Sequence, residues 1–452
     1  MPGKGERVVT ARAQARAKRT PTKAQLLRTR LGLAAKADPT RRFHALYDKM
    51  YRPDILQLAW TSVRANHGAA GVDRESIEEI EAHGVEAFLN QLQTELQEGT
   101  YRPMPVRRVY IPKASGGRRP LGIASVRDRV VQTAVKLVLE PIFEADFLDC
   151  SYGFRPSRGA HDALNAIRVT VHQGTYFVVD ADIRQFFDSI EHDLLIRAVA
   201  RRVSDPKVLR LVRRFVAAGI MEDGKVRSAS VGTPQGGPLS PLLANAVLHG
   251  LDVMWGRKGA EYGTLVRYAD DAVVLCKTRR DAERALARLH EILGKLRLEI
   301  NEEKTHLVDL RWGREGFTFL GFYHRMRRMY RRRITALLRW PAPRACKALR
   351  ERVRTLTARD QVGKDEKTVV EAVNRTVRGW GNYFTKGNSS RVFGSMDHYV
   401  QLRLTIWENR KFKRRSHSWG PQATAEHFRQ IGVYRLSGKA QRSGRMPEAT
   451  SR

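Results

Sequence analysis

The sequence predicts an α+β protein in which a mixed catalytic domain is followed by a helical C-terminal part. Two apolar runs that end in or enclose acids read as buried strands, TYFVVDADI at 175–183 and LVRYADDAVVLC at 265–276. Further along the chain, apolar residues repeat at three- and four-residue spacing, which is typical of one packed helical face. Helices of this kind are expected near 343–358, 366–385 and 394–410.

The composition indicates a globular protein that binds a polyanion. The 452 residues suggest two to four domains, and 42% of them are hydrophobic. The net charge of +35 makes nucleic acid the expected partner. No apolar run approaches the ~20 residues of a spanning helix, so a membrane partner is not expected. Only three cysteines occur, Cys150, Cys276 and Cys346, without a Cys-x-x-Cys pair, so we expect neither zinc nor a disulfide scaffold, and a cytoplasmic location.

The first half of the chain divides into a basic arm and a folded region. Residues 1–42 hold twelve Lys/Arg and two acids, which predicts a basic extension or, alternatively, a transit peptide. Globular patterning begins at Phe43. A helix is expected first, then a strand, a Gly-rich turn and a second strand over 106–125, and a helix over 126–147. On that last helix Val130, Ala134, Leu137 and Val138 form one apolar face.

The second half contains further helices and two clusters of arginine or lysine. Asp188 and Glu191 are expected to form a capping box that opens a helix at 189. A Gly-rich loop leads into a helix over 232–251, and an amphipathic helix is expected over 281–298. Six arginines occur within 325–333, and the tail beyond 411 is basic and irregular.

Paired acids are the clearest candidate site. Asp270 and Asp271 lie between two apolar runs that read as a hairpin. Adjacent aspartates suit a solvated turn, but their carboxylate oxygens also suit Mg²⁺. Asp180 and Asp182 share one face of the strand at 175–183, since side chains alternate along a strand. Acids from two neighbouring strands would be able to hold two Mg²⁺ ions for phosphoryl transfer.

The chain resembles the reverse transcriptase–maturases encoded by group II introns over residues 43 to about 400. The resemblance rests on segments that occur together in the family's order. They are IPKASGGRRPLGI, SYGFRPSRGAHDAL, VDADIRQFFDSI, GTPQGGPLSPLLANAVL, RYADDAVVL, LEINEEKTHL, FTFLGF and RGWGNYF. The resemblance implies a right-hand polymerase with fingers and palm over 43–323, an α-helical thumb or maturase domain over 324–400, and a basic DNA-binding region over 401–452.

The resemblance also implies the catalytic residues. Asp182 is similar to the family's first palm aspartate, and Asp270 and Asp271 are similar to its paired aspartates. These three would act catalytically and bind two Mg²⁺ ions, while positioning and charge neutralisation supply most of the catalysis. Asp180 is expected to be structural.

Other substrate-binding residues follow from the same resemblance. Lys113 and Arg119 flank a Gly-rich turn and would bind the incoming triphosphate, unless they are only a solvated basic hairpin. Gln235 would contact the nascent base pair or the template, with glycines beside it that allow close backbone approach. Gly321 resembles the primer grip.

Two residues keep alternative interpretations. Lys304 resembles the lysine proposed to protonate the pyrophosphate leaving group, or it is an exposed lysine at a helix end. Phe187 would select deoxynucleotides by blocking a 2′-hydroxyl, or it is a core residue.

The function implied is RNA-directed DNA synthesis from group II intron RNA during retrohoming, together with help in splicing. Partners would be intron RNA, a DNA target or primer and dNTPs. No His-Asn-His cluster is present, so we expect an endonuclease-lacking, class IIC-like member that inserts into single-stranded or opened DNA. Two other functions stay open: a domesticated reverse transcriptase with a host role, and an RNA-binding splicing cofactor without catalysis.

Overall fold

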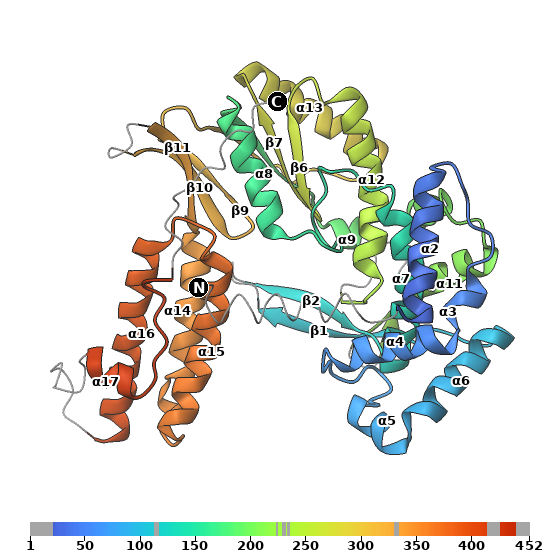
Figure 1. Cartoon of the computed structure of the whole chain (residues 1–452), viewed down its shortest axis with the longest axis horizontal. Coiled ribbons are helices and arrows are strands. Elements are labelled where there is room, and N and C mark those ends of the chain that lie inside the picture. Colours follow the sequence, from blue (N-terminus) through green and yellow to red (C-terminus); the bar gives the residue numbers. More distant parts are fainter. Residues whose placement is uncertain are drawn as a thin grey trace, which may run out of the picture.

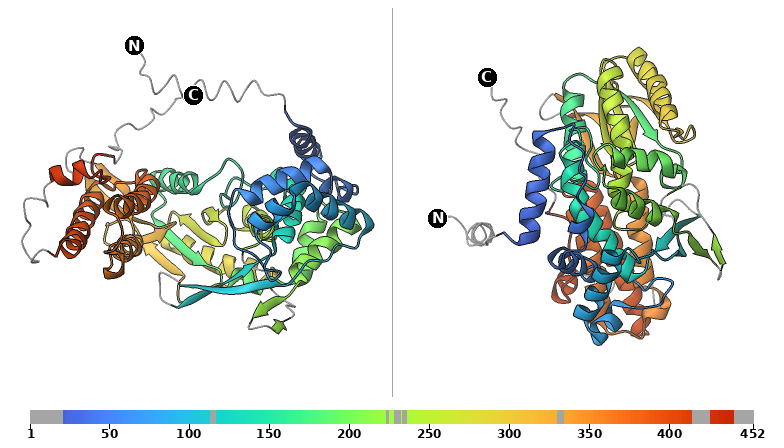
Figure 2. Two further views of the ribbon diagram at one scale, coloured as in Figure 1. Left: turned by 90° about the horizontal axis from the view of Figure 1, so that it is seen from below. Right: turned by 90° about the vertical axis from the view of Figure 1, so that its right-hand side faces the viewer.

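The computed structural model describes residues 21–112, 117–222, 225–227, 232, 236–329, 334–413 and 425–439. The helices nearest the N-terminus gather at one end of the molecule, and the helices of the C-terminal part gather at the other (Figure 1). Three sheets lie between these two ends, and two further views agree with this arrangement (Figure 2). The mixed α/β class expected from the sequence is therefore confirmed.

The N-terminal part is a set of helices, which are α2 (Lys23–Ala37), α3 (Tyr47–Met50), α4 (Pro53–Arg64), α5 (Ile77–His83), α6 (Val85–Glu98) and α7 (Val126–Glu144). Helices α2, α3 and α4 pack against α7, α6 packs against α4, and α5 packs against α6. Capping boxes at Thr22 and Ser76 open α2 and α5, since each hydroxyl accepts from the backbone three residues on. The apolar face predicted for α7 is confirmed, because Val130, Ala134 and Val138 are fully buried.

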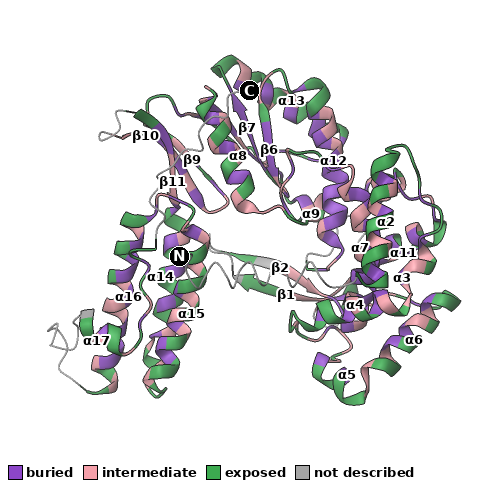
Figure 3. Cartoon of the chain, in the orientation of Figure 1, coloured by how far each residue is buried: buried purple, intermediate pink, exposed green. Residues whose placement is uncertain are grey.

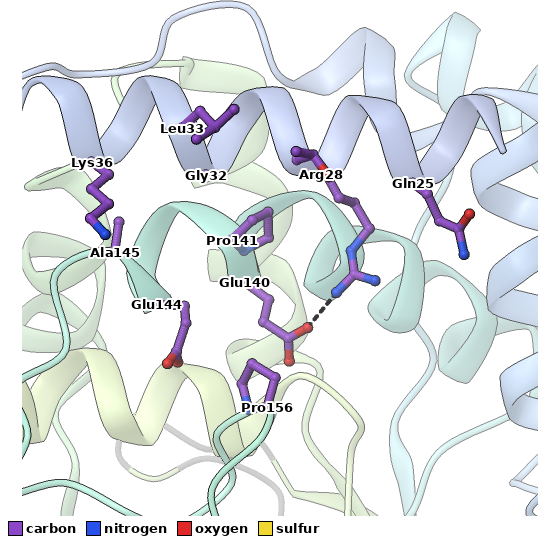
Figure 4. A pocket seen from close by; sticks show the side chains of 11 residues that line it. Gln25, Arg28, Gly32, Leu33, Lys36, Glu140, Pro141, Glu144, Ala145 and Pro156 are labelled. Atoms are coloured by element: carbon purple, nitrogen blue, oxygen red, sulfur yellow. Dashed lines mark hydrogen bonds and ion pairs between the residues drawn. The ribbon is translucent and has the colours of Figure 1, made fainter. Parts of the chain in front are cut away.

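A close contact between α2 and α7 borders a hollow of about 530 Å³. A Cβ atom at Gly32 would lie 3.5 Å from Pro141, so the two helices approach in ordinary contact there. Arg28 donates to Glu140 at 2.7 Å across the hollow (Figure 4). The lining residues come from α2, α7 and Pro156, and none comes from the strands that carry the acid pairs.

A four-stranded sheet of order β2-β1-β4-β5 lies beside these helices. Its strands are β1 (Val106–Pro112), β2 (Arg118–Ile123), β4 (Ile220–Glu222) and β5 (Lys225–Arg227). The antiparallel pairing of β1 with β2 agrees with the two strands predicted within 106–125, whereas residues 113–116 of the predicted Gly-rich turn lie outside the described residues.

The central sheet has the order β6-β7-β3-β8, and all its neighbours are antiparallel. Its strands are β3 (Phe177–Asp182), β6 (Thr264–Tyr268), β7 (Asp271–Cys276) and β8 (His306–Asp309). Side chains of β3 alternate between two apolar cores. Phe177 and Val179 join the core that contains α7, whereas Val178 joins the core shared with the C-terminal helices. The strand is therefore buried on both faces, as its sequence predicted. Its neighbour β7 is likewise mostly buried (Figure 3).

Helices on either side of the central sheet complete these two cores. They are α8 (Ala160–His172), α10 (His192–Ala200), α11 (Pro206–Ala217), α12 (Ser240–Lys258) and α13 (Arg279–Lys295). Helix α8 contributes to the core that contains Val178, and the other four contribute to the core that contains Val179.

The predicted capping box at Asp188 is wrong. Asp188 lies inside a short helix, α9 (Phe186–Ser189), and Ile190 then takes an extended conformation with ψ 116°. Helix α10 begins only after Glu191, which is its N-cap and makes no side-chain capping bond. The break at Ile190 separates two helices where the sequence pattern suggested one.

The C-terminal part combines a three-stranded sheet with helices. The sheet has the order β11-β10-β9, from β9 (Gly316–Phe319), β10 (Phe322–Met329) and β11 (Ile334–Pro341). The helices are α14 (Pro343–Leu356), α15 (Glu366–Phe384), α16 (Ser390–Lys411) and α17 (Ala425–Gln430). The helices expected near 343–358, 366–385 and 394–410 are confirmed. Residue 324 lies within β10, so this strand continues across the boundary expected at 323/324.

Candidate active site

The strand register brings the predicted acids together. Asp182, the last residue of β3, lies directly opposite Asp271, the first residue of β7. Tyr268 pairs with Asp271, so β6 and β7 are joined by a two-residue turn, Ala269–Asp270. Three carboxylates from two separate parts of the chain therefore lie at one end of the central sheet.

Two carboxyl groups at this end of the sheet have raised pKa values. Removal from water, and then the carboxylates of Asp270 and Asp182, raise the pKa of Asp271 to about 6. Burial, followed by the charges of Asp271 and Asp182, raises the pKa of Asp180 to about 7. Asp180 shares a strand face with Asp182 but pairs with Val273, further from the turn.

Lys304 supplies a cation to the cluster. Its Nζ donates to Asp182 Oδ2 at 2.9 Å, and its side chain is 63% exposed. The backbone nearby is fixed to the end of β3, because Asn301 N donates to the Asp182 carbonyl at 2.8 Å. The Thr305 hydroxyl accepts from Asp182 N at 3.3 Å. The lysine is therefore held beside a predicted catalytic aspartate.

Comparisons with known proteins show which family the chain belongs to. The sequence model of the reverse transcriptase (RNA-dependent DNA polymerase) family matches residues 111–324. The group II intron maturase-specific domain matches residues 346–423. Protein YkfC of Escherichia coli (strain K12) is 34% identical over 338 residues, which are 66% of this chain and 87% of YkfC. The chain belongs to the group II intron reverse transcriptase–maturase family.

Two further relatives carry the intron in their names. The group II intron-encoded protein LtrA of Lactococcus lactis subsp. cremoris is 41% identical over 212 residues, 46% of this chain and 35% of LtrA. An uncharacterised 91 kDa protein in the cob intron of Schizosaccharomyces pombe is 32% identical over 260 residues, 57% of this chain and 30% of that protein. The matched region thus spans about a third of these two relatives. RNA-directed DNA polymerisation and assistance to intron splicing are the functions of this family.

The donor chemistry of the reverse transcriptase–maturase site fits the divalent metal that its family implies. Carboxylates are hard oxygen ligands suited to Mg²⁺. Burial, and after it the neighbouring charges of Asp270 and Asp182, raises the pKa of Asp271, and a bound cation would stabilise its charged form. In the described ranges, however, no three His, Cys, Asp or Glu side chains are arranged as a metal site. The Lys304 ammonium, 2.9 Å from Asp182 Oδ2, takes the place beside that carboxylate.

Phe187 lies one short loop beyond Asp182 in this reverse transcriptase–maturase. It is half-buried in α9, packs against the core that contains α7 and contacts the Phe186 ring at 5.3 Å between centroids. Gln185 before it has φ 44°, a left-handed conformation that turns the chain sharply after β3. Both interpretations of Phe187 are compatible with this position, because one part of the ring is packed and another part faces solvent.

The residues expected to bind the triphosphate and the template are only partly placed. Lys113 and Gln235 lie outside the described residues. The backbone of Arg119 lies in β2 opposite Ile111. Gly236, next to Gln235, has φ 118°, and a Cβ there would lie 2.6 Å from the Gly122 carbonyl. The Gly236 backbone therefore lies close to strand β2, and the approach to a base pair beside Gln235 stays a prediction.

Gly321 lies at the tip of the β9–β10 hairpin. Leu320 and Gly321 both have positive φ, 48° and 77°, as a tight two-residue turn of this kind requires. The Leu320 carbonyl accepts from the Tyr383 hydroxyl at 2.9 Å. A Cβ at Gly321 would lie 3.5 Å from the Phe384 ring. The hairpin tip is therefore attached to the helix that carries the RGWGNYF segment.

Arg267 is a residue of this site that the sequence reasoning missed. It is the second-last residue of β6, separated from the Ala269–Asp270 turn by Tyr268, and its side chain is completely buried. The available signal was a single cation inside the apolar run LVRY, where an unpaired charge would be very unfavourable.

Proposed function

We propose that the chain copies group II intron RNA into DNA at the end of the central sheet. Asp182, Asp270 and Asp271 would hold two Mg²⁺ ions there, and the observation that carries this assignment is the register of Asp182 opposite Asp271. When bound, the metal neutralises charge on the primer hydroxyl and the triphosphate. The substrates would be an intron RNA template, a DNA primer or target and dNTPs.

The protein's own residues would orient these substrates. Lys113 and Arg119 would bind the triphosphate and Gln235 the nascent pair, while Gly321 would lie along the primer. Lys304 would give up its contact with Asp182 and donate a proton to the pyrophosphate leaving group. Phe187 would exclude a 2′-hydroxyl. Asp180, buried behind the cluster, would be structural.

The domain roles follow the family arrangement of a right-hand polymerase. We assign fingers and palm to residues 43–323, the thumb or maturase domain to 324–400 and DNA binding to 401–452, with a basic extension over 1–42. The maturase-specific match over 346–423 supports intron RNA binding by the C-terminal helices. The net charge of +35 suits an association with nucleic acid. We place the protein in the bacterial cytoplasm. Among the described residues no helix has the length and apolarity needed to cross a bilayer.

Primer extension on an RNA template tests the assignment directly. The double variant Asp270→Ala/Asp271→Ala should lose DNA synthesis and retain intron RNA binding, because the acids serve chemistry and the basic surfaces serve affinity. Asp309→Ala, which removes an acid from the strand β8 of the same sheet, is the matched control. Wild-type extension by the double variant would refute the assignment. Loss of extension together with loss of RNA binding would indicate misfolding rather than a missing ligand.

A further inference from the structure

We propose that Arg267 is a positioning residue that holds the Ala269–Asp270 turn in its catalytic shape. This inference rests on the proposed function, because it gives the turn its importance. It assigns to a buried cation a role in placing the two aspartates of the turn, through hydrogen bonds to the backbone and side chains around them.

Every N–H of the Arg267 guanidinium has an acceptor. Nε and Nη2 donate to the two carboxylate oxygens of Asp252 at 2.7 and 2.5 Å. Nη2 also donates to the Ser151 hydroxyl at 2.8 Å. Nη1 donates to the Asn245 side-chain oxygen at 3.2 Å and to the Ala269 carbonyl at 3.0 Å. Because guanidinium has five N–H donors in a fixed plane, this set fixes the side chain in one orientation.

The contact with Ala269 acts on a strained part of the backbone. Ala269 has φ 55° at the first position of the two-residue turn, where the left-handed conformation favours glycine. A strained residue of this kind persists only where its surroundings hold it. The Arg267 side chain donates a hydrogen bond to the carbonyl of Ala269, the residue immediately before Asp270. This hydrogen bond therefore restrains the backbone at the point where the Asp270–Asp271 pair begins.

The segment 150–153 also binds the strand β6 beside the turn. Arg267 N donates to the Cys150 carbonyl at 2.7 Å, and Tyr152 N donates to the Arg267 carbonyl at 2.9 Å. Asn245 Nδ2 donates to the Gly153 carbonyl at 2.8 Å. Gly153 in turn lies so close that a Cβ there would be 2.4 Å from Ala269 N. Arg267 and Asn245 therefore join three separate segments at the turn.

Stability alone does not explain a cation at this position. Both side chains of the Arg267–Asp252 pair are 0% exposed. Replacing such a pair by apolar residues of similar volume is often neutral or stabilising, because both charges had to leave water. An apolar pair would fill the core, but it would offer no donor to the Ala269 carbonyl. The geometry thus points to orientation of the turn as the role of the pair.

The double variant Arg267→Met/Asp252→Leu separates the two roles. It removes both charges together, so no unpaired charge remains buried, and it also removes the donor to Ala269. We expect a folded protein with wild-type affinity for intron RNA. Its rate of primer extension should fall about a hundredfold, since a misplacement near 1 Å has that effect on a catalytic group. The Mg²⁺ concentration for half-maximal activity should rise, because the turn would no longer hold Asp270 and Asp271 in position beside Asp182.

A second buried ion pair provides the matched control. Arg202 and Asp146 pair at 3.3 Å, with side-chain exposures of 3% and 19%, and Arg202 also donates to the Ala35 carbonyl. Arg202→Met/Asp146→Leu should alter thermal unfolding without moving the Mg²⁺ requirement. Both double variants are compared in unfolding, RNA binding and primer extension over a range of Mg²⁺ concentrations.

The outcomes separate this inference from the proposed function. A folded Arg267→Met/Asp252→Leu variant with a wild-type rate and Mg²⁺ requirement overturns the positioning role, as does a slower variant with an unchanged Mg²⁺ requirement. If that variant does not fold, the single variant Asn245→Leu tests the positioning role instead, because it removes only the hydrogen bonds of an uncharged side chain to Arg267 and to Gly153. An increased Mg²⁺ requirement supports the role, and an unchanged requirement overturns it. The proposed function itself fails only if Asp270→Ala/Asp271→Ala remains active.

Discussion

Gly153→Ala should damage catalysis although Gly153 carries no functional group. A Cβ atom at this position would lie 2.4 Å from Ala269 N and 3.0 Å from the Tyr268 carbonyl carbon. Both neighbours are backbone atoms of the catalytic turn, so neither yields by rotating a side chain. Since non-bonded heavy atoms pack at about 3.5 Å, the turn and the 150–153 segment must separate by about 1 Å.

That displacement sets the magnitude of the expected effect. Overpacking of this kind costs about 1–3 kcal/mol of folding stability. A misplacement of about 1 Å at catalytic groups lowers the rate about a hundredfold. We therefore expect a folded Gly153→Ala protein whose single-turnover rate of primer extension falls about a hundredfold, while its affinity for intron RNA stays the same.

The assay compares this variant with Gly159→Ala, a glycine-to-alanine change six residues further along the chain. The Cβ at Gly159 would lie 3.8 Å from Asp162 Oδ2, an ordinary contact, and the backbone there is extended, with φ −143°. Gly159→Ala should extend primers at the wild-type rate. If Gly153→Ala unfolds like wild type and also extends primers like wild type, the claim that this segment fixes the turn is wrong.

Four other changes test the remaining assignments. Phe187→Val should raise the ratio of ribonucleotide to deoxynucleotide incorporation about tenfold, because the smaller side chain leaves room for a hydroxyl. An unchanged ratio would indicate that Phe187 is only a packing residue. Lys304→Gln should slow nucleotide addition about a hundredfold without weakening dNTP binding, and an unchanged rate would exclude proton donation. Burial, and then the charge of Arg339, lowers the pKa of His324 to about 3, so this histidine stays neutral in the folded protein while it becomes protonated in the unfolded chain. That protonation should lower the free energy of unfolding by about 2 kcal/mol between pH 6.5 and pH 5. His324→Phe should abolish that part of the pH dependence in urea unfolding at the two pH values. Deleting residues 1–20, which hold six Lys/Arg and precede the packed helix α2, should flatten the salt dependence of nucleic-acid affinity, and an identical slope would contradict a role in binding.

The sequence by itself determined the residues of the site and the kinds of elements that carry them. Asp182, Asp270 and Asp271 stand at the ends of apolar runs, and this local pattern predicted both the strands and the acids. The helices α14 and α15 follow within two residues of the expected bounds, because their apolar spacing is a property of short segments. Family motifs in their order indicated a reverse transcriptase–maturase before any geometry was available.

Local patterns were less reliable where neighbouring segments compete for the same residues. Asp188 and Glu191 have the spacing of a capping box, yet Ile190 is extended and divides the region into α9 and α10. The Ile190 side chain is completely buried, so packing of this residue, rather than the capping preference, sets the boundary.

Only the tertiary structure decided how the acids meet and what holds them. The register of Asp182 opposite Asp271 joins strands about ninety residues apart, and no local signal in either strand fixes it. The role of Arg267 depends on acceptors from Ser151, Asn245 and Asp252, which come from two other parts of the chain. A buried guanidinium needs partners for all its donors, and whether they are in reach is determined by packing. The sequence specified the chemistry of the site, whereas long-range packing specified its geometry.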